Sequence, residues 1–199
     1  MAAPNLILAS GSAVRATILK NAGVPFTVVK TQTDEDAIKK DGLQKGHALI
    51  DIALDLAHAK AAAVKCHEAT YVLGSDQILE FEGRPYDKPK SRSEAKQRFL
   101  EFSGKPHHLI NASVIMHRGK RIWHHVETPQ LIMRNFSERE IDLYMEQSPD
   151  DILKSVGGYM VEDRGIRLFE KINGDYFAVL GLALSPLLKA LRDYEIIEF

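Results

Sequence analysis

Apolar positions along this chain form short continuous runs that alternate with longer stretches of helical period. Short apolar runs bounded by turn residues predict strands, and they fall at 5–9, 26–29, 71–81, 109–116, 122–133 and 166–169. Stretches with an i, i+3, i+4 pattern predict helices, and they fall at 15–20, 45–66, 91–102, 137–146 and 185–192.

Two of the predicted helices begin with a recognisable cap. Ser91 is followed by Glu94, and Ser137 by Glu140, which is the spacing of a capping box. The polar segment 31–41 holds three consecutive acidic residues and is predicted as a loop. Because helices alternate with strands and hairpins also occur, we expect an α/β protein with a mixed twisted sheet flanked by helices.

Composition narrows the range of partners. The 199 residues are 45% hydrophobic, which predicts one domain over 1–199 with room for two lobes. Its 26 basic and 27 acidic residues balance, so neither a nucleic-acid polymer nor a membrane is expected as partner, and no apolar run reaches membrane-span length. The single cysteine, Cys66, cannot form an intramolecular disulfide and lies in an apolar stretch, which predicts a cytoplasmic protein with this thiol in its core.

The first candidate for chemistry is Ser10-Gly11-Ser12 with Arg15, between a predicted strand and a predicted helix. A glycine allows close approach of the backbone, and a helix N-terminus favours an anion, so this segment could bind phosphate. The alternative is an ordinary serine-capped helix whose arginine faces solvent. The Gly-Lys-Ser/Thr ending of a Walker loop is missing.

The second candidate is Asp76, near the end of an apolar run, where open α/β sheets usually place ligand-binding groups. Its carboxylate could hold a metal or accept a proton from water, or it could simply cap a turn. Lys60 and Lys88 are isolated cations, which taken alone are more often solvated.

Acidic and histidine clusters raise the question of metals. Asp34, Glu35 and Asp36 could supply oxygen ligands to Mg²⁺, although taken by themselves they are more often a solvated acidic loop. Adjacent histidines at 107–108 and 124–125 point to opposite faces of a strand, so neither pair chelates one zinc ion.

The order of these segments resembles the Maf family of nucleotide pyrophosphatases along nearly the whole chain. The run from Leu6 to Arg15 resembles the family's LILASxSPRR signature, with Ala13 and Val14 as departures. Further matches are Leu56-Ala57-His58-Ala59-Lys60-Ala61, Gly74-Ser75-Asp76-Gln77, Asp87-Lys88-Pro89, Ser103-Gly104-Lys105-Pro106-His107, Gly157-Gly158-Tyr159, Gly174-Asp175-Tyr176 and Gly181-Leu182-Ala183-Leu184. Lys154 stands where the family commonly has an aspartate.

The resemblance implies hydrolysis of a nucleoside triphosphate to a monophosphate and pyrophosphate, in a Maf/ITPase-like fold of two lobes around a central cleft, often as a homodimer. It implies Asp76 as the proton acceptor and a divalent cation, Mg²⁺ or Mn²⁺, near Asp34, Glu35 and Asp76. The residues expected to bind the triphosphate are Ser10, Ser12, Arg15, Lys60 and Lys88.

The same resemblance bears on the base. Gln77 and Glu162 resemble the 7-methyl-GTP branch of the family more than its dTTP/UTP branch. A glutamate suits a guanine edge because its carboxylate accepts from ring and exocyclic N–H groups. A different class of function is a non-enzymatic nucleotide-binding regulator of septum formation, against which the retained cations and Asp76 argue. A single-stranded RNA-binding module lacks the basic patches and aromatic residues that it needs.

Overall fold

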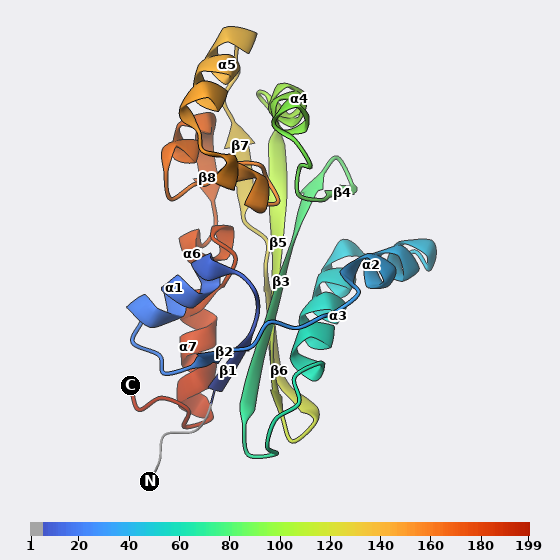
Figure 1. Ribbon diagram of the computed structural model, residues 1–199, viewed down its shortest axis with the longest axis vertical. Coiled ribbons are helices and arrows are strands. Elements are labelled where there is room, and N and C mark those ends of the chain that lie inside the picture. The colour runs from blue at the N-terminus through green and yellow to red at the C-terminus, as the bar shows by residue number, and fades with distance from the viewer. Residues whose placement is uncertain (1–5) are drawn as a thin grey trace. The chain divides into compact units, whose positions relative to one another are not determined.

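The computed structural model describes residues 6–199, which form seven α-helices, two 3-10 helices and eight strands (Figure 1). The strands belong to a mixed sheet of order β2-β1-β3-β5-β7-β8, in which β4 pairs with β3 and β6 pairs with β5. The prediction of a mixed α/β protein is therefore confirmed. The chain divides into two compact units, and strands β3 and β5 contribute residues to both.

Unit 1 consists of 6–77, Asn111–Glu127 and Asp175–Phe199. Strand β1 lies between β2 and β3 and runs parallel to both. The elements of unit 1 are β1 (Leu6–Ala9), α1 (Ala13–Asn21), β2 (Thr27–Val28), α2 (Glu35–Gln44), α3 (Leu49–Ala62), the first part of β3 (Tyr71–Phe81), the second part of β5 (Pro106–His117), β6 (Lys120–Glu127), α6 (Tyr176–Val179) and α7 (Leu184–Asp193).

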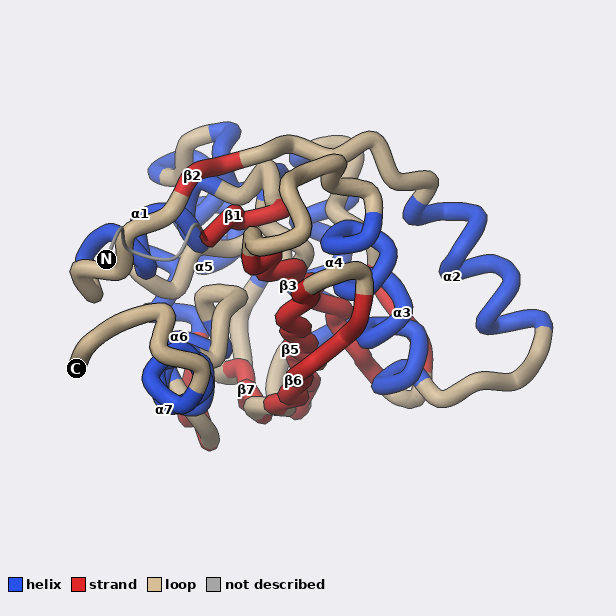
Figure 2. The backbone as a smooth tube through the Cα atoms, turned by 90° about the horizontal axis from the view of Figure 1, so that it is seen from below, coloured by secondary structure: helices blue, strands red, loops and turns tan. Residues whose placement is uncertain are grey.

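Helices cover both faces of the unit 1 strands. Figures 1 and 2 show α1 and α7 on one face and α3 on the other. Leu6 and Leu8 alternate along β1 and pack into the same buried cluster as Leu19 of α1 and Leu187 of α7. Since successive strand residues point to opposite faces, this alternation fixes the α1 and α7 side of the sheet.

On the other face, α3 approaches β3 very closely at Gly74. A Cβ at this position would lie 2.1 Å from the Ala57 carbonyl oxygen and 2.9 Å from the Ala61 Cβ. Only glycine permits this contact. Asp76 lies two residues further along β3 and therefore projects from the same face as Gly74, toward the helix that carries Lys60.

Unit 2 consists of Ile78–Ile110 and Thr128–Gly174. Phe99 and Phe102 of α4 are fully buried, and α4 packs against α5. The elements of unit 2 are the remainder of β3 and β5, β4 (Arg84–Tyr86), α4 (Arg92–Phe102), β7 (Gln130–Met133), α5 (Glu138–Gln147), the 3-10 helices η1 (Asp150–Lys154) and η2 (Arg164–Leu168), and β8 (Phe169–Asn173).

Several predicted elements are confirmed in detail. Ser91 caps α4 by accepting from the backbone N–H of Glu94. Ser137 and Glu140 form the predicted capping box at the start of α5. The predicted strand at 71–81 is β3. The predicted strand at 5–9 corresponds to β1 over Leu6–Ala9. Residue 5 of that prediction lies outside the described part of the chain.

The prediction of a loop over 31–41 is confirmed for 31–34 and wrong for 35–41. Helix α2 begins at Glu35, and Asp34 is its N-cap, with its Oδ1 accepting from the Ala37 N–H at 2.9 Å. The acidic run thus stabilises a helix start, because carboxylates in the first turn interact favourably with the helix dipole.

Three other predictions need correction. The predicted strand 122–133 is two strands, β6 and β7, separated at 128–129 by a segment that contains a proline. Residues 166–168 belong to η2, so the last strand starts only at Phe169. Helix α3 ends at Ala62, which leaves Cys66 beyond it and exposed rather than in the core. Within 6–199, no helix has both the length and the apolar character needed to cross a membrane.

Candidate functional site

The start of α1 presents hydroxyl groups beside free backbone amides. Ser12 is the N-cap and accepts from the Arg15 N–H at 3.3 Å. Ser10, at the end of β1, accepts from the Ser12 N–H at 3.2 Å. The first turn of α1 contains no acidic residue, so its N-terminus keeps the positive potential that attracts an anion.

The side chain of Arg15 turns inward, which excludes the alternative of a solvent-facing arginine. Arg15 is only 8% exposed. Its Nε donates to the Gly181 carbonyl at 2.7 Å, and its Nη1 donates to the Ser75 carbonyl at 2.8 Å and to Ser10 Oγ at 3.2 Å. Burial lowers the pKa of Arg15 from its ordinary value, and the nearby carboxylates of Asp76 and Glu35 oppose this shift. The guanidinium therefore provides a fixed positive charge beside the start of α1.

Gly181 holds this region together through its carbonyl oxygen. Besides Arg15 Nε, the oxygen accepts from Asn111 Nδ2 at 2.7 Å and from Ser75 Oγ at 3.3 Å. Gly181 has φ +109°, a conformation that side-chain-bearing residues rarely adopt, and an added Cβ would lie 3.5 Å from Arg15 Nε. Strands β3 and β5, helix α1 and the loop before α7 thus meet at one backbone oxygen.

Asn111 is a buried positioning residue that the sequence analysis missed. It is fully buried, and its Nδ2 also donates to the Asp76 carbonyl at 3.3 Å while its Oδ1 accepts from the Ala183 N–H at 3.1 Å. Ser113, likewise buried, donates to Ser75 Oγ at 3.2 Å. The available signal was a pair of polar residues two positions apart within an apolar strand, where Asn is disfavoured unless its amide is satisfied.

Asp76 and Lys60 form a close ion pair. Lys60 Nζ lies 2.5 Å from Asp76 Oδ1 and 3.0 Å from Glu35 Oε1. The side chains of Lys60 and Asp76 are 12% and 9% exposed, whereas that of Glu35 is 45% exposed. One ammonium thus bridges the first turn of α2 and strand β3.

The two carboxylates that contact Lys60 are of the type that binds a hard divalent cation. Mg²⁺ commonly uses one or two carboxylates and completes its coordination with water and substrate phosphates. Within 6–199 no cluster of three or more metal-ligating side chains occurs, so Glu35 and Asp76 would be an open, two-carboxylate set. Asp34, the third predicted ligand, caps α2 through its Oδ1 and does not form a three-residue cluster with them in the described part of the chain.

Gln77 points away from β3 toward α6. Its Nε2 donates to the carbonyls of Ala178 at 2.9 Å and Val179 at 3.3 Å. This amide group is thus committed to the end of α6, and only its Oε1 is left to accept from a ligand.

The remaining predicted site residues, Lys88 and Glu162, belong to unit 2 and are both exposed. The segments that carry them are in contact within this unit. Gly158 has φ +75°, and a Cβ there would lie 3.3 Å from Pro89, the neighbour of Lys88. Arg98 of α4 donates to the Val156 carbonyl at 2.6 Å, which anchors the start of the 156–162 segment.

A buried histidine anchors the same segment further along. His107 Nε2 lies 2.6 Å from Tyr159 Oη, and both side chains are buried. Burial, with a smaller contribution from His108, lowers the pKa of His107 from 6.5 to about 3, and burial raises the pKa of Tyr159. The neutral imidazole is therefore a hydrogen-bonding group of the unit 2 core.

The departures from the family signature have structural roles. Val14, in the first turn of α1, is partly buried and packs against the unit 1 core. Lys154 forms an exposed ion pair with Asp151 at 2.7 Å.

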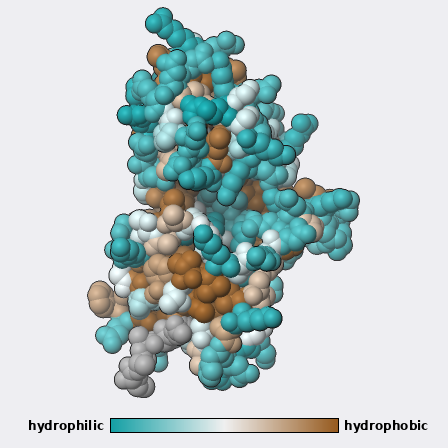
Figure 3. All heavy atoms as spheres, in the orientation of Figure 1, coloured by the Kyte–Doolittle hydropathy of each residue, from teal (hydrophilic) through white to brown (hydrophobic). Residues whose placement is uncertain are grey.

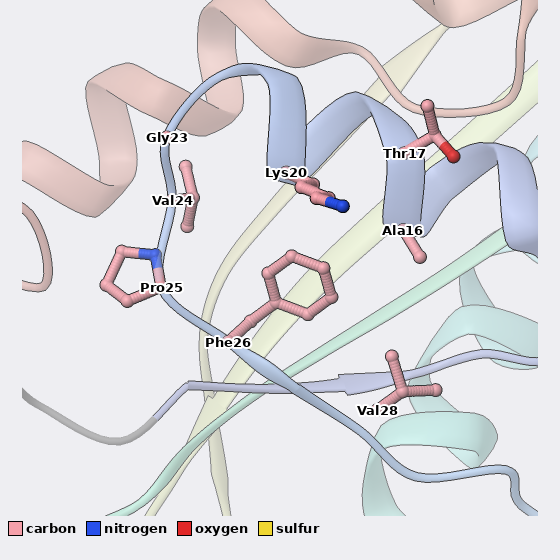
Figure 4. A pocket seen from close by; sticks show the side chains of 8 residues that line it. All are labelled: Ala16, Thr17, Lys20, Gly23, Val24, Pro25, Phe26 and Val28. Atoms are coloured by element: carbon pink, nitrogen blue, oxygen red, sulfur yellow. The ribbon is translucent and has the colours of Figure 1, made fainter.

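A surface pocket of about 520 Å³ lies on another part of α1 (Figure 4). Phe26 and Val28 line it together with Lys20, and none of the predicted site residues does. Figure 3 shows apolar side chains gathered at the surface of this part of unit 1. This pocket is separate from the chemistry around Asp76.

An α/β fold with a helix N-terminus, two cations and a carboxylate in one unit defines a protein equipped to bind and transform an anionic ligand. The chain belongs to the Maf family, because the family model described as Maf-like protein matches residues 5–194.

Individual relatives match over almost their full length. A protein of Granulibacter bethesdensis named nucleoside triphosphate pyrophosphatase is 42% identical over 191 residues, covering 96% of this chain and 97% of the relative. One of Caulobacter vibrioides with the same name is 45% identical, covering 93% of each chain. A protein of Bartonella henselae named 7-methyl-GTP pyrophosphatase is 42% identical over 198 residues, covering 100% of each chain.

Proposed function

We propose that this protein is a nucleoside triphosphate pyrophosphatase that hydrolyses the α–β phosphoanhydride to release a nucleoside monophosphate and pyrophosphate. Membership of the Maf family and the names of its relatives support this activity. The observation that carries it is the placement of the Asp76 carboxylate beside the Lys60 ammonium, with the Arg15 guanidinium bound to the preceding strand residue.

The residues of unit 1 would have different roles in the reaction. Ser10, Ser12 and the amides at the start of α1 bind phosphate oxygens, and Arg15 and Lys60 neutralise their charge. Asp76 accepts a proton from the attacking water. This division suits phosphoryl chemistry, in which positioning and charge stabilisation provide most of the rate enhancement.

A divalent cation, Mg²⁺ or Mn²⁺, would be held by Glu35 and Asp76. When bound, it supplies positive charge to the phosphate oxygens and to the water that attacks them. Asp34 would contribute indirectly, by fixing the first turn of α2 and with it Glu35.

Unit 2 would supply Lys88 as a further cation for the triphosphate and Glu162 as a reader of the base. We propose that Glu162 favours a guanine-type base such as 7-methylguanine, and we propose Gln77 of unit 1 as a further substrate-binding residue. A carboxylate that accepts two N–H groups from guanine finds only one in uracil. The name of the Bartonella henselae relative is consistent with this preference.

The test is a substrate panel. Purified protein is incubated with 7-methyl-GTP, GTP, dTTP and UTP, each with Mg²⁺ or Mn²⁺, and both released pyrophosphate and released orthophosphate are measured. We expect pyrophosphate and the monophosphate in equal amounts, with metal required. Tight nucleotide binding without any hydrolysis would instead favour the non-enzymatic regulator.

The proposal also includes the oligomeric state of the protein and its location in the cell. We propose a homodimer, which light scattering at several concentrations tests. We also propose that the protein works in the cytoplasm, where its nucleotide substrates are made and a lone exposed thiol stays reduced. Fractionation of cells followed by the pyrophosphate assay would test the location.

A further inference from the structure

We propose that Lys60 occupies the cation position between Glu35 and Asp76 in the nucleotide-free protein, so that a divalent metal binds there tightly only when a triphosphate draws Lys60 away. This inference rests on the proposed function for the identity of the anion. It concerns the order of binding rather than the reaction itself.

The first argument is geometric. Lys60 Nζ lies 2.5 Å from Asp76 Oδ1 and 3.0 Å from Glu35 Oε1, so one ammonium already uses an oxygen of each carboxylate. A Mg²⁺ ion bound between these two carboxylates would take an oxygen of each at about 2.0–2.1 Å, which places it where the ammonium now lies. The ammonium and the metal therefore cannot both sit between these two carboxylates.

The second argument is electrostatic. Two carboxylates with one ammonium leave a single net negative charge, and the buried Arg15 guanidinium also interacts with both carboxylates. If Lys60 stayed in place, a divalent cation would be repelled by the charges of Lys60 and Arg15. The two carboxylates that attract it would already be paired with Lys60. Repulsion between cations at contact distance is strong where water is scarce, as it is around Asp76 at 9% exposure.

A triphosphate changes this balance. Its oxygens offer Lys60 new acceptors, and the long flexible stem of lysine allows the ammonium to move over several ångströms. Glu35 is the more exposed of the two partners, so the ion pair is open to solvent on its side. Once Lys60 pairs with phosphate, both carboxylates are free for the metal. Nucleotide and metal then promote each other's binding, which is a reciprocal coupling.

The fold keeps Lys60 near enough to Asp76 for this competition. Gly74 lets α3 touch β3, and Lys60 lies one turn from Ala57, which makes that contact. Asp34 fixes the start of α2 by capping it, which keeps Glu35 within reach. The ion pair is therefore built by three elements and does not depend on a chance surface contact.

The experiment measures Mn²⁺ binding without nucleotide, by the electron paramagnetic resonance signal of free Mn²⁺. The variant Lys60→Met keeps the apolar stem and removes the charge, and Lys60→Arg keeps the charge. We expect Lys60→Met to bind Mn²⁺ at least about tenfold more tightly than the wild type, although its turnover falls. Lys60→Arg should stay weak. The control Lys45→Met breaks an exposed ion pair with Asp41 and should change neither property.

Two further measurements sharpen the result. Adding Glu35→Gln to Lys60→Met should remove the gain, which places the tighter site at this pair. A non-hydrolysable nucleoside triphosphate should tighten Mn²⁺ binding more in the wild type than in Lys60→Met. Circular dichroism checks that each variant is folded.

Unchanged or weaker Mn²⁺ binding by folded Lys60→Met would overturn the inference, whatever the enzyme does. Equal tightening of Mn²⁺ by nucleotide in both proteins would also overturn it. If Mn²⁺ binds more tightly to Lys60→Met but no nucleotide is hydrolysed by the wild type, the competition stands and the proposed function fails.

Discussion

The Nε–H group of Arg15 donates to the carbonyl oxygen of Gly181 at 2.7 Å, which joins the first helix of the chain to the loop before the last one. The same oxygen accepts from Asn111 and Ser75. Arg15, the last residue of the signature segment, is thus part of the internal structure of unit 1 as well as a source of positive charge.

Arg15→Lys should lower both stability and kcat/KM. Lysine cannot reproduce the planar set of N–H groups that reaches Gly181, Ser75 and Ser10, and its ammonium would be buried with fewer partners. Loss of charge-assisted hydrogen bonds of this kind typically costs about 1.5–3 kcal/mol. Thermal denaturation and steady-state kinetics measure the two effects. Arg192→Lys, at an exposed position, is the control, and equal behaviour of the two variants would contradict the role of Arg15.

Asp76→Asn should nearly abolish turnover while the protein stays folded. The amide keeps the shape of the side chain but no longer accepts a proton or balances Lys60. General-base contributions amount to about 10²–10⁴-fold in rate. Single-turnover pyrophosphate release measures the loss, and Asp55→Asn on the exposed side of α3 serves as control. An Asp76→Asn protein that keeps more than about half of the wild-type rate would show that another group accepts the proton.

Lys88→Ala should weaken use of the triphosphate, since it removes a cation proposed to contact phosphate. The expected cost is about 1.5–3 kcal/mol in kcat/KM. Lys90→Ala removes another exposed lysine two residues away and should have little effect. Matching kinetics for the two variants would indicate that Lys88 is an ordinary solvated lysine with no contact to the triphosphate.

Glu162→Gln should reduce discrimination between bases, because an amide presents donors where the carboxylate presents only acceptors. A mismatched polar contact costs about 1–3 kcal/mol. The measurement is kcat/KM for 7-methyl-GTP, GTP, dTTP and UTP, with Glu170→Gln as the exposed control in the same unit. A uniform loss on all four nucleotides would exclude a base-reading role.

Stability should fall in acid because of His107. The pKa of His107 is lowered from 6.5 to about 3 in the folded protein. Between these two pH values the imidazole is therefore protonated in the unfolded chain and neutral in the folded protein. This group therefore removes up to about 1.4 kcal/mol of stability per pH unit between about pH 6.5 and 3. Urea unfolding of the wild type and of His107→Phe/Tyr159→Phe isolates its contribution. Identical pH slopes in the two proteins would contradict it.

Local signals in the sequence predicted most of the fold. Serine caps and turn residues located α4 and α5, and the apolar run of β3 located the strand that carries Asp76. The acidic segment was misjudged because the same carboxylates suit a solvated loop and a helix start. The choice between loop and helix depends on whether Asp34 accepts from the Ala37 N–H, and the composition of the segment does not predict that hydrogen bond.

The site was predictable only as far as its residues occur in motifs. The positions of Arg15 and Asp76 along the chain made them candidates, and the family resemblance assigned them and Lys60 to one predicted site, but neither predicted their hydrogen-bonding partners. Asn111 lies 35 positions along the chain from Asp76 and 70 from Gly181, the residues whose carbonyls it contacts. Contacts between such distant positions follow from the topology of the sheet. Arg15 was ambiguous for the same reason, since its inward direction depends on a carbonyl 166 residues away.

That separation has a consequence for synthesis. As the nascent chain leaves the ribosome, Arg15 emerges long before Gly181, and the third segment of unit 1 starts only at Asp175. Until then the hydrophobic side of β1 lacks α7, and the guanidinium lacks the carbonyl of Gly181 as an acceptor. Co-translational folding can therefore give this protein its local helices early, whereas a working centre forms only after translation has passed residue 181. A ribosome stalled before that point would carry a chain that holds Asp76 and Lys60 but is expected to release no pyrophosphate.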